Sequence, residues 1–398
     1  MQNFKKQSGV EDIMKIKWKS IISMVCVAAL LGGCAGSKKE EKIPESEKPV
    51  ISERQGNLDV LNPSAYGNVE DLKLAPGSYI SIIGKTSGNA FWDEVKAGTK
   101  QAEEDINNML GYSGEERIKV NYSAPSKGEN VEDQINILDE ELARNPVAVG
   151  MAIIDSTACQ VQFDLASENG IPIIAFDSGS DYQDIQAMCS TDNVAMGTGA
   201  AVKLASLLHE KGEVAVFVHD KNSTSGQDRE RGFVEELQRN YPEITNIVTY
   251  HLDDLEETAK MIAAEKNAMK AEGEEDILAE NLTQEEVIQY LLEKNPNIKG
   301  CFATNVDATQ TLVNTLEIMK KDDIKIVGID GGKEQIEDLK SGKIDGLYIQ
   351  NPYGMGYAAV VAAARASLGL GNQAVIDSGM IWVTKDNLDD KSIKKMIY

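Results

Sequence analysis

Nine short apolar runs alternate with amphipathic stretches, and this alternation constrains the fold more than any other feature of the chain. Each run has the length of a strand, and helical periodicity fills most of the gaps, as in Trp92, Val95, Ala102 and Ile106. Strand and helix that alternate so regularly predict parallel sheets covered by helices on both faces. The expected strands are Tyr79–Ile83, Ile118–Tyr122, Ala148–Ile154, Ile173–Phe176, Val214–Val218, Ile247–His251, Gly300–Ala303, Ile326–Ile329 and Gly346–Ile349.

The number of expected strands favours two domains over one. The chain has 398 residues, which is long enough for two hydrophobic cores. Nine strands spread over the body of the chain suit two doubly wound lobes better than one sheet. The predicted fold class is therefore α/β, with two doubly wound parallel-sheet lobes.

The N-terminal region has the pattern of an export signal. Residues 14–34, MKIKWKSIISMVCVAALLGGC, contain three lysines, a short apolar run and small residues before Cys34. The run is short for a membrane span, so residues 1–33 are predicted to be a signal peptide. The Leu31–Cys34 stretch resembles the bacterial lipobox, which predicts a lipid on Cys34 and a place on the outer face of the bacterial cell membrane. An unmodified Cys34 and a start at either Met1 or Met14 remain open.

Residues 34–77 are predicted to be the lipidated cysteine followed by a flexible tether. The stretch 37–77 has few large apolar residues, mixed charge and several Pro and Gly residues. Such a composition buries too little surface to fold by itself.

The overall charge and the cysteine pattern exclude several classes of function. A formal net charge of -24 leaves no basic field for nucleic acid and favours a monomer. Cys159, Cys189 and Cys301 match no zinc spacing and are expected to be buried apolar residues, with a Cys159–Cys189 disulfide as the alternative.

No motif indicates catalysis, a cofactor or a metal. The GKTS sequence at 84–87 looks like the end of a phosphate-binding loop, but Tyr79 occupies the position where that loop requires glycine. His209, His219 and His251 have no metal-ligand spacing, and no Gly-x-Ser-x-Gly motif is present. Any ATP hydrolysis linked to this chain is therefore expected in a separate subunit.

Polar side chains recur directly after the expected strands. In parallel sheets, ligands bind where loops leave the carboxyl ends of the strands. The segment GKTSGNAFW follows the first strand, and DKNSTSGQDRERGF follows the fifth. Carboxylates, amides, a guanidinium and aromatic rings are the groups that hold a polyol. The residues at these strand ends include Asp177, Asn305, Asp330 and Gln350.

From about Tyr79 onward, the chain resembles the ribose/galactose-type periplasmic binding proteins, the solute receptors of ABC importers. The resemblance rests on GNAFWDEVKAG, GIPIIAFDS, STDNVAMG, SGQDRERGF, CFATNVDAT, IVGIDGG, SGKIDGLYIQNPYGMG and DSGMIWVTKDN, in the family's order. It implies two lobes joined by three crossovers, with residues 78–191 and 351–379 in the first and 192–350 and 380–398 in the second. It also implies that a monosaccharide is closed between the lobes and delivered to an ABC permease with a separate ATPase subunit.

The resemblance also implies a set of ligand-binding residues. It assigns polar contacts to Asn89, Asp177, Arg229, Asn305, Asp330 and Gln350, and an aromatic surface for the sugar to Phe91 and Trp92. Two positions depart from the ribose receptors and are added to the expected site. Ser178 stands in place of a second arginine, and Lys85 in place of a small polar residue. The loss of one cationic side chain and the gain of another lead to the hypothesis that the ligand is a sugar other than ribose, or a sugar that carries an acidic group.

Other interpretations of the same residues stay open. Phe91 and Trp92 could form a helix-start cluster in the core, and the Asp and Asn residues after strands could only shape turns. Arg229 could belong to a solvated helix face.

Other functions also stay open. A sensor subunit that presents ligand to a membrane receptor or kinase would share the fold, as would a sugar-responsive repressor, although the signal occupies the place of its DNA-binding domain. Ribose is the first expected ligand, before galactose, xylose or a furanose derivative.

The acidic stretch 253–297 is longer than the resemblance requires. Its pattern predicts two helices with a solvated acidic face, and Thr283 with Glu286 predicts a capping box for the second.

Overall fold

The computed structural model describes residues 54–398, apart from residue 272 and the side chain of residue 246. The predicted signal peptide, Cys34 and residues 34–53 of the predicted tether lie outside these residues. Within the part of the chain that is described, no helix has the length and apolar character needed to cross a membrane.

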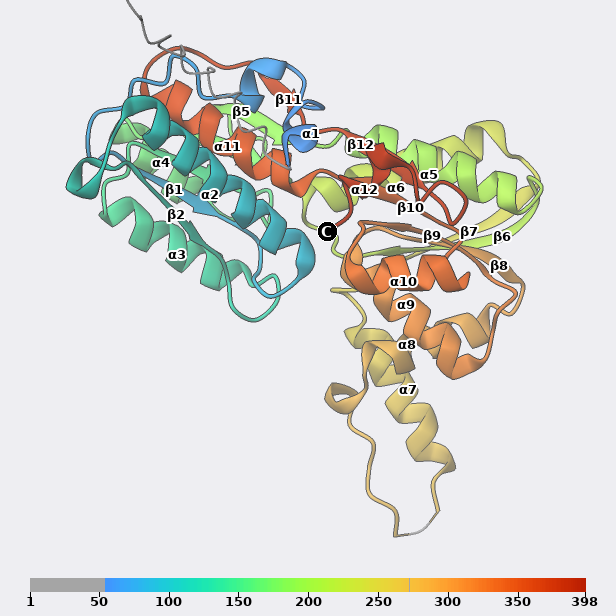
Figure 1. The fold of residues 1–398 in the computed structure, drawn as a ribbon. Helices are drawn as coiled ribbons and strands as arrows, with labels where there is room; N and C mark the ends of the chain where they lie inside the picture. The colour runs from blue at the N-terminus through green and yellow to red at the C-terminus, as the bar shows by residue number, and fades with distance from the viewer. Residues whose placement is uncertain (1–53, 272) are drawn as a thin grey trace, which may run out of the picture. The chain divides into compact units, whose positions relative to one another are not determined.

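Two six-stranded sheets organise residues 79–383 (Figure 1). The first has the order β11-β5-β4-β3-β1-β2, and all its neighbouring strands are parallel. Its strands are β1 (Tyr79–Ile83), β2 (Lys119–Ser123), β3 (Ala148–Met151), β4 (Ile173–Phe176), β5 (Ile185–Ser190) and β11 (Val375–Asp377).

The second sheet has the order β12-β10-β9-β8-β6-β7 and is parallel except for the β10–β12 pair. Its strands are β6 (Gly212–Val218), β7 (Ile244–His251), β8 (Ile298–Ala303), β9 (Lys325–Ile329), β10 (Gly346–Gln350) and β12 (Met380–Val383). The chain passes between the sheets after β5, after β10 and after β11. The predicted fold class, with two parallel-sheet lobes and three crossovers, is confirmed. Each sheet with the helices packed on it is called the first or the second lobe below.

Helices cover both faces of the first sheet. One core contains residues of α2 (Ala90–Leu110) and α11 (Pro352–Ser367), and the other contains residues of α3 (Val131–Ala143) and α4 (Gln160–Glu168). The strands between these layers are buried on both sides, which is why β4 reads as the continuous apolar run Ile-Ile-Ala-Phe.

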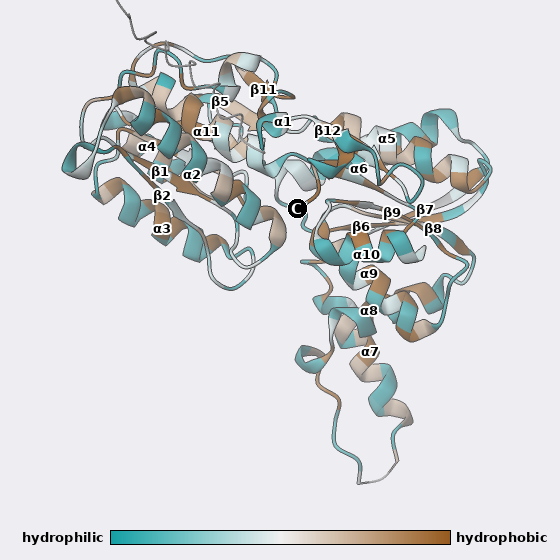
Figure 2. Cartoon of the chain, in the orientation of Figure 1, coloured by the Kyte–Doolittle hydropathy of each residue, from teal (hydrophilic) through white to brown (hydrophobic). Residues whose placement is uncertain are grey.

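The second sheet is covered in the same way. On one face lie α5 (Asn193–Leu207) and α6 (Thr224–Asn240), and on the other lie α9 (Val306–Met319) and α10 (Lys333–Ser341). Hydrophilic and hydrophobic segments alternate along α3 and α10 in Figure 2, as expected for helices with one buried side. The last helix is α12 (Lys391–Lys394).

Two glycines set the close approach of α5 and α6. A Cβ at Gly197 would overlap the backbone carbonyl of Arg229, and a Cβ at Gly232 would overlap that of Val194. The two helices can therefore pack backbone against backbone only while both positions lack a side chain. This contact fixes the position of Arg229, one of the predicted site residues.

The prediction of a flexible tether is wrong for residues 54–77. This segment forms α1 (Gln55–Leu58) and the 3-10 helix η1 (Ser64–Gly67). Its scattered apolar residues are buried in the same core as α2 and α11, and the Asn57 amide donates to Asn351 Oδ1 at 3.1 Å. The prediction from composition failed because the few apolar residues of this segment are buried against another part of the chain. They are Leu58, Leu61, Tyr66, Val69, Leu72 and Leu74.

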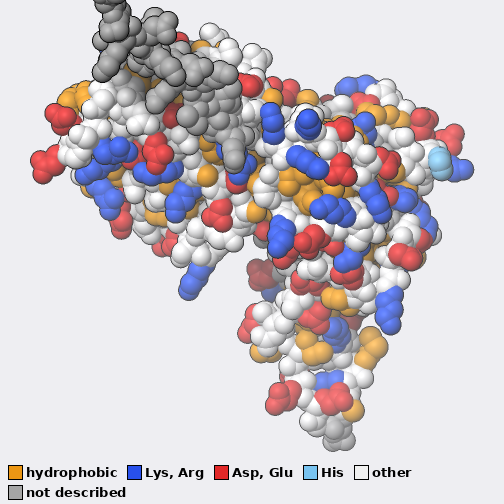
Figure 3. Space-filling view, viewed as in Figure 1, with side chains coloured by type: hydrophobic (Ala, Val, Ile, Leu, Met, Phe, Trp, Pro, Cys, Tyr) orange, Lys and Arg blue, Asp and Glu red, His pale blue; other side chains and the backbone are white. Residues whose placement is uncertain are grey.

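The acidic stretch forms the two predicted helices, α7 (Glu256–Met269) and α8 (Gln284–Lys294), with the 3-10 helix η3 (Ala279–Asn281) between them. The predicted capping box is confirmed, because Thr283 Oγ1 accepts from the Glu286 amide and the Glu286 carboxylate accepts from the Thr283 amide. The acidic side chains of α7 include Glu256 and Glu257, which pair with Lys260. On the face shown in Figure 3, acidic and basic side chains are interspersed.

The three cysteines of the body are free and buried. Cys189 is fully buried in the first lobe and Cys301 in the second. The structure therefore confirms the prediction of small buried apolar residues, and the alternative Cys159–Cys189 disulfide does not form.

Candidate functional site

The predicted polar residues sit where strands of both sheets end. Asn89 caps the helix that follows β1, since its Oδ1 accepts from the Trp92 amide at 3.1 Å. Asn305 caps α9 in the same way, through the Ala308 amide at 2.8 Å. Capping fixes the side chains of the first helical turn, because it satisfies backbone donors that have no partner within the helix.

Two of the carboxylates occupy an unusual backbone conformation. Asp177 follows β4 with φ of 57°, and Asp330 follows β9 with φ of 82°. Left-handed backbone is uncommon outside glycine, and it is often found at functional sites. Here the conformation turns the chain sharply at the carboxyl ends of two strands, one in each lobe.

The two lobes enclose a cavity at these strand ends. All predicted ligand-binding residues except Ser178 line it. The cavity measures about 20 Å³, which is room for about one water molecule. Its lining residues are Lys85, Asn89, Phe91, Trp92, Glu129, Asp177, His219, Ser225, Arg229, Asn305, Val306, Asp330 and Gln350.

Arg229 is buried and is held by three hydrogen bonds. Its Nε donates to Asn193 Oδ1 at 2.8 Å, and its two terminal nitrogens donate to the Thr304 carbonyl at 2.7 Å and to Gln350 Oε1 at 2.9 Å. The side chain is 2% exposed, so the interpretation as a solvated helix face does not hold. A guanidinium has five N–H donors, so two remain for a ligand.

Asp330 accepts hydrogen bonds at both carboxylate oxygens. Oδ1 accepts from the side-chain amide of Gln350 at 2.8 Å and from the Tyr398 hydroxyl at 3.1 Å, and Oδ2 accepts from the Val306 backbone amide at 2.9 Å. Burial raises the pKa of Asp330, and the nearby Arg229 guanidinium opposes that rise in part.

Lys85 is buried among carboxylates. Its Nζ lies 3.5 Å from Asp177 Oδ2 in the same lobe and donates to Ser225 Oγ at 3.3 Å in the other lobe. Burial acts to lower the pKa of Lys85, but the attraction of Glu129, Asp177 and Asp220 outweighs it, so the pKa is raised. Lys85 therefore keeps its charge in the cavity wall, where carboxylates already balance it.

Both aromatic residues of the opening turn of α2 reach the cavity. Phe91 and Trp92 pack edge to face with ring centroids 5.1 Å apart, and Trp92 contacts Phe176 of β4. The two side chains are 4% and 5% exposed and also belong to the core of the first lobe. Core packing and cavity lining are therefore not alternatives here, because one edge of the core forms the cavity wall.

Ser178 is the predicted residue that does not line the cavity. Its hydroxyl lies 3.2 Å from Thr224 Oγ1, and the same oxygen of Thr224 accepts from the Gly179 amide at 2.8 Å. Ser178 and Gly179 follow β4 of the first lobe, whereas Thr224 begins α6 of the second. The position next to Asp177 thus forms a contact between the lobes.

Four lining residues were not in the predicted set: Glu129, His219, Ser225 and Val306. His219 follows β6 directly, so the strand-end rule could have found it; its Nδ1 lies 2.7 Å from Thr304 Oγ1 and its Nε2 lies 3.1 Å from Asp220. Glu129 lies in the loop before α3, where no strand end marks it, and loss of hydration raises its pKa.

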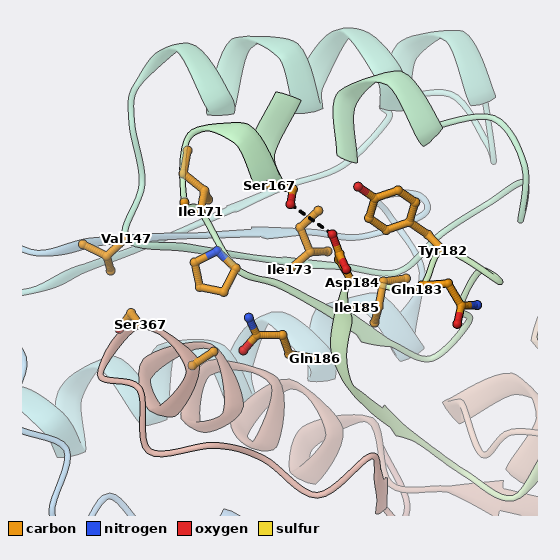
Figure 4. A pocket seen from close by; sticks show the side chains of 13 residues that line it. Val147, Ser167, Ile171, Ile173, Tyr182, Gln183, Asp184, Ile185, Gln186 and Ser367 are labelled. Atoms are coloured by element: carbon orange, nitrogen blue, oxygen red, sulfur yellow. Dashed lines mark hydrogen bonds between the residues drawn. The ribbon is translucent and has the colours of Figure 1, made fainter. Parts of the chain in front are cut away.

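A larger pocket of about 500 Å³ lies elsewhere on the first lobe (Figure 4). Its lining residues Val147, Ile173 and Ile185 stand at the amino ends of strands, the edge opposite to the one that carries the predicted residues. Among the polar side chains there, Ser167 Oγ donates to Asp184 at 3.0 Å and the Tyr182 hydroxyl donates to Asp164 at 2.8 Å. None of the predicted site residues lines this pocket.

Comparison with known proteins finds one family model and many similar proteins. The family described as periplasmic binding protein domain matches residues 80–371. The chain is 23% identical to the D-allose-binding periplasmic protein of Escherichia coli over 306 residues, which is 73% of this chain and 86% of that protein. It is 24% identical to the ribose import binding protein of Bacillus subtilis over 302 residues, which is 76% of this chain and 83% of that protein.

The fold also matches solved structures. An ABC transporter solute-binding protein from Agrobacterium vitis, bound with α-D-tagatopyranose, is 25% identical with a TM-score of 0.67. The match covers 81% of this chain and 99% of that structure.

Proposed function

Because the chain belongs to the periplasmic binding protein domain family, we propose that it captures a neutral monosaccharide between its two lobes and delivers it to an ABC permease. The relatives named above are a D-allose-binding periplasmic protein and a ribose import binding protein, and the family is one of non-catalytic solute-binding proteins. The expectation that this chain is not an enzyme is confirmed by this membership. ATP hydrolysis then falls to a separate subunit of the importer.

The observation that carries the proposal is the convergence of both lobes on one cavity. Asn89 and Asp177 come from the first lobe, and Arg229, Asn305 and Asp330 come from the second. Donors and acceptors of this kind match the hydroxyls of a sugar ring, while an aromatic face covers its C–H groups. Neither lobe alone presents the complete set.

Ligand binding requires the lobes to separate first. The cavity has room for about one water molecule, so a sugar enters only after the walls move apart. We propose that residues 78–191 with 351–379, and 192–350 with 380–398, move as two bodies about the three crossovers. A sugar that contacts both bodies only when they are close shifts the population toward closure, and the permease then recognises the closed form.

The charges of the cavity favour a neutral sugar over an acidic one. Two cationic side chains, Lys85 and Arg229, face the carboxyl groups of Glu129, Asp177 and Asp330. Lys85 already has Asp177 beside it, so a sugar carboxylate would compete with a fixed partner and approach two further carboxyl groups. Ribose remains the first candidate, with allose added because of the relative from Escherichia coli, and galactose and xylose follow.

A thermal-shift screen of the purified full chain against pentoses, hexoses and sugar acids tests this function. One neutral sugar should raise the unfolding temperature, since a ligand that binds only the folded state stabilises it by mass action. The Arg229→Lys variant should lose most of that shift, because lysine keeps the charge but not the planar set of donors. A screen in which no sugar shifts the wild-type chain would reject the proposal.

We also propose that lipid on Cys34 holds the protein as a monomer at the outer face of the cell membrane. The support is the lipobox-like sequence ahead of Cys34 together with membership of an extracytoplasmic family. In a bacterial host, Cys34→Ala should move the protein from the membrane fraction to the soluble fraction and abolish labelling with a fatty-acid probe. Import is tested separately by deleting the gene for this chain in its host. The deletion should abolish uptake of the sugar, whereas loss of only the transcriptional response to the sugar would indicate a sensor.

A further inference from the structure

Tyr398, the last residue of the sequence, reaches the site from outside the predicted set. Its hydroxyl donates to Asp330 Oδ1 at 3.1 Å, and its backbone amide donates to the Gly331 carbonyl at 3.4 Å. Its ring packs edge to face against Phe91 with centroids 6.4 Å apart. Tyr398 thus contacts one cavity residue of each lobe, Asp330 in the second and Phe91 in the first.

The hydrogen bond from Tyr398 helps to hold the Asp330 carboxylate in its orientation. Each carboxylate oxygen offers about two lone pairs. The Gln350 amide and the Tyr398 hydroxyl both donate to Oδ1 and fill it, whereas Oδ2 receives only the Val306 amide. One lone pair is therefore left on Oδ2, the oxygen next to the cavity wall at Val306. Without the Tyr398 hydroxyl, Oδ1 would regain a free lone pair, and the carboxylate would be held less tightly, by the Gln350 and Val306 donors alone.

The segment that ends in Tyr398 is anchored in the structure. Ile393 and Met396 are buried in the core of the second lobe. Tyr398 itself packs against the apolar cores of both lobes. The tyrosine is therefore held in place from the second lobe while its ring faces the first.

We propose that Tyr398 is a positioning residue for sugar binding, which fixes the Asp330 carboxylate through its hydroxyl and adds a contact between the lobes through its ring. This inference rests on the proposed function, because it assigns Tyr398 to the same site. It makes the carboxyl-terminal segment part of the binding site, although Tyr398 does not line the cavity.

Calorimetric titration of the full chain with D-ribose and D-allose tests the inference. Tyr398→Phe keeps the ring and removes only the hydroxyl, so affinity for the sugar that binds should fall about 3- to 10-fold, the range expected for the loss of one ordinary hydrogen bond. Tyr250→Phe is the matched control in the same lobe, because its hydroxyl accepts from Asn295 Nδ2 at 3.0 Å and it does not line the cavity. The control should bind as the wild type does.

A double-variant cycle separates positioning from a purely structural role. If Tyr398 acts through Asp330, then Tyr398→Phe should weaken binding less than twofold when Asp330→Asn is already present. In Tyr398→Phe, the preference for the parent sugar over its monodeoxy forms should also shrink, since a mobile carboxylate selects its hydroxyl partner less strictly.

The outcomes are distinguishable. A wild-type chain that binds neither these sugars nor any other of the screen overturns the proposed function. A wild-type chain that binds, with Tyr398→Phe binding equally well, overturns this inference alone. Full additivity of the two substitutions, with discrimination against deoxy sugars unchanged, also overturns it, because Tyr398 would then not act through Asp330.

Discussion

Thr224 offers the sharpest test of lobe closure. Its side-chain oxygen accepts from the Gly179 amide at 2.8 Å and lies 3.2 Å from Ser178 Oγ, so it joins α6 of the second lobe to the loop after β4 of the first. Thr224→Val keeps the shape of the side chain and removes this oxygen. The change should therefore act on the closed form and leave each lobe intact.

The size of the effect follows from the groups that lose a partner. In the closed form of Thr224→Val, the Gly179 amide would be left without its acceptor, which costs about 1–3 kcal/mol for a buried group. In the open form, water can hydrate the same amide, so the penalty falls on closure alone. A shift of about 1–3 kcal/mol corresponds to a change of about 5- to 150-fold in the closure equilibrium.

Apparent affinity reports this shift directly. If the open form predominates without ligand, the dissociation constant for the sugar should rise by the same factor, because only the closed form makes all contacts. Isothermal titration gives the dissociation constant, and small-angle scattering with and without sugar gives the extent of closure. Thr224→Ser keeps the oxygen and should bind within about twofold of the wild type, as expected when the hydrogen bond remains.

The reasoning fails in two recognisable ways. Equal affinity in Thr224→Val and the wild type would mean that this contact does not help to hold the lobes together. A loss of affinity in Thr224→Val that is matched by Thr224→Ser would point to packing at this position and not to the hydrogen bond.

Three further predictions concern stability. Asp330→Asn should weaken sugar binding without lowering the free energy of unfolding at pH 7. Because burial raises the pKa of Asp330, the wild-type carboxyl adds stability as the pH falls through that raised pKa. Thermal melts of the variant at decreasing pH should lack this added stability. Lys85→Met should lower the free energy of unfolding, measured in urea, by about 3 kcal/mol, because it leaves the Asp177 charge buried without its partner. Adding Asp177→Asn to this variant should recover part of the lost free energy of unfolding. No recovery would mean that the Lys85–Asp177 pair is not coupled. Gly197→Ala should lower the free energy of unfolding by about 1–3 kcal/mol, because the new Cβ would overlap the Arg229 carbonyl. An unchanged urea midpoint would show that α5 and α6 can separate freely.

The strands in the interior of both sheets could be predicted from the local pattern of apolar residues. All nine expected strands are present, and the expected bounds of β1 and β4 agree with the structure, because a strand buried on both faces leaves a continuous apolar run in the sequence. The strands that escaped prediction are β5, β11 and β12. Two of them have only three or four residues, and β5 mixes polar with apolar side chains, so their pairing depends on partners elsewhere in the chain.

The candidate site residues followed from the sequence by two routes: the strand-end rule pointed to the segments after the parallel strands, and the family resemblance assigned individual residues within them. Their partners did not follow. That Lys85 lies beside Asp177, that Ser178 meets Thr224, and that Tyr398 reaches Asp330 are consequences of how distant segments pack. A local pattern records which face of a strand or helix is apolar, but it carries no information on which remote side chain will fill the space opposite.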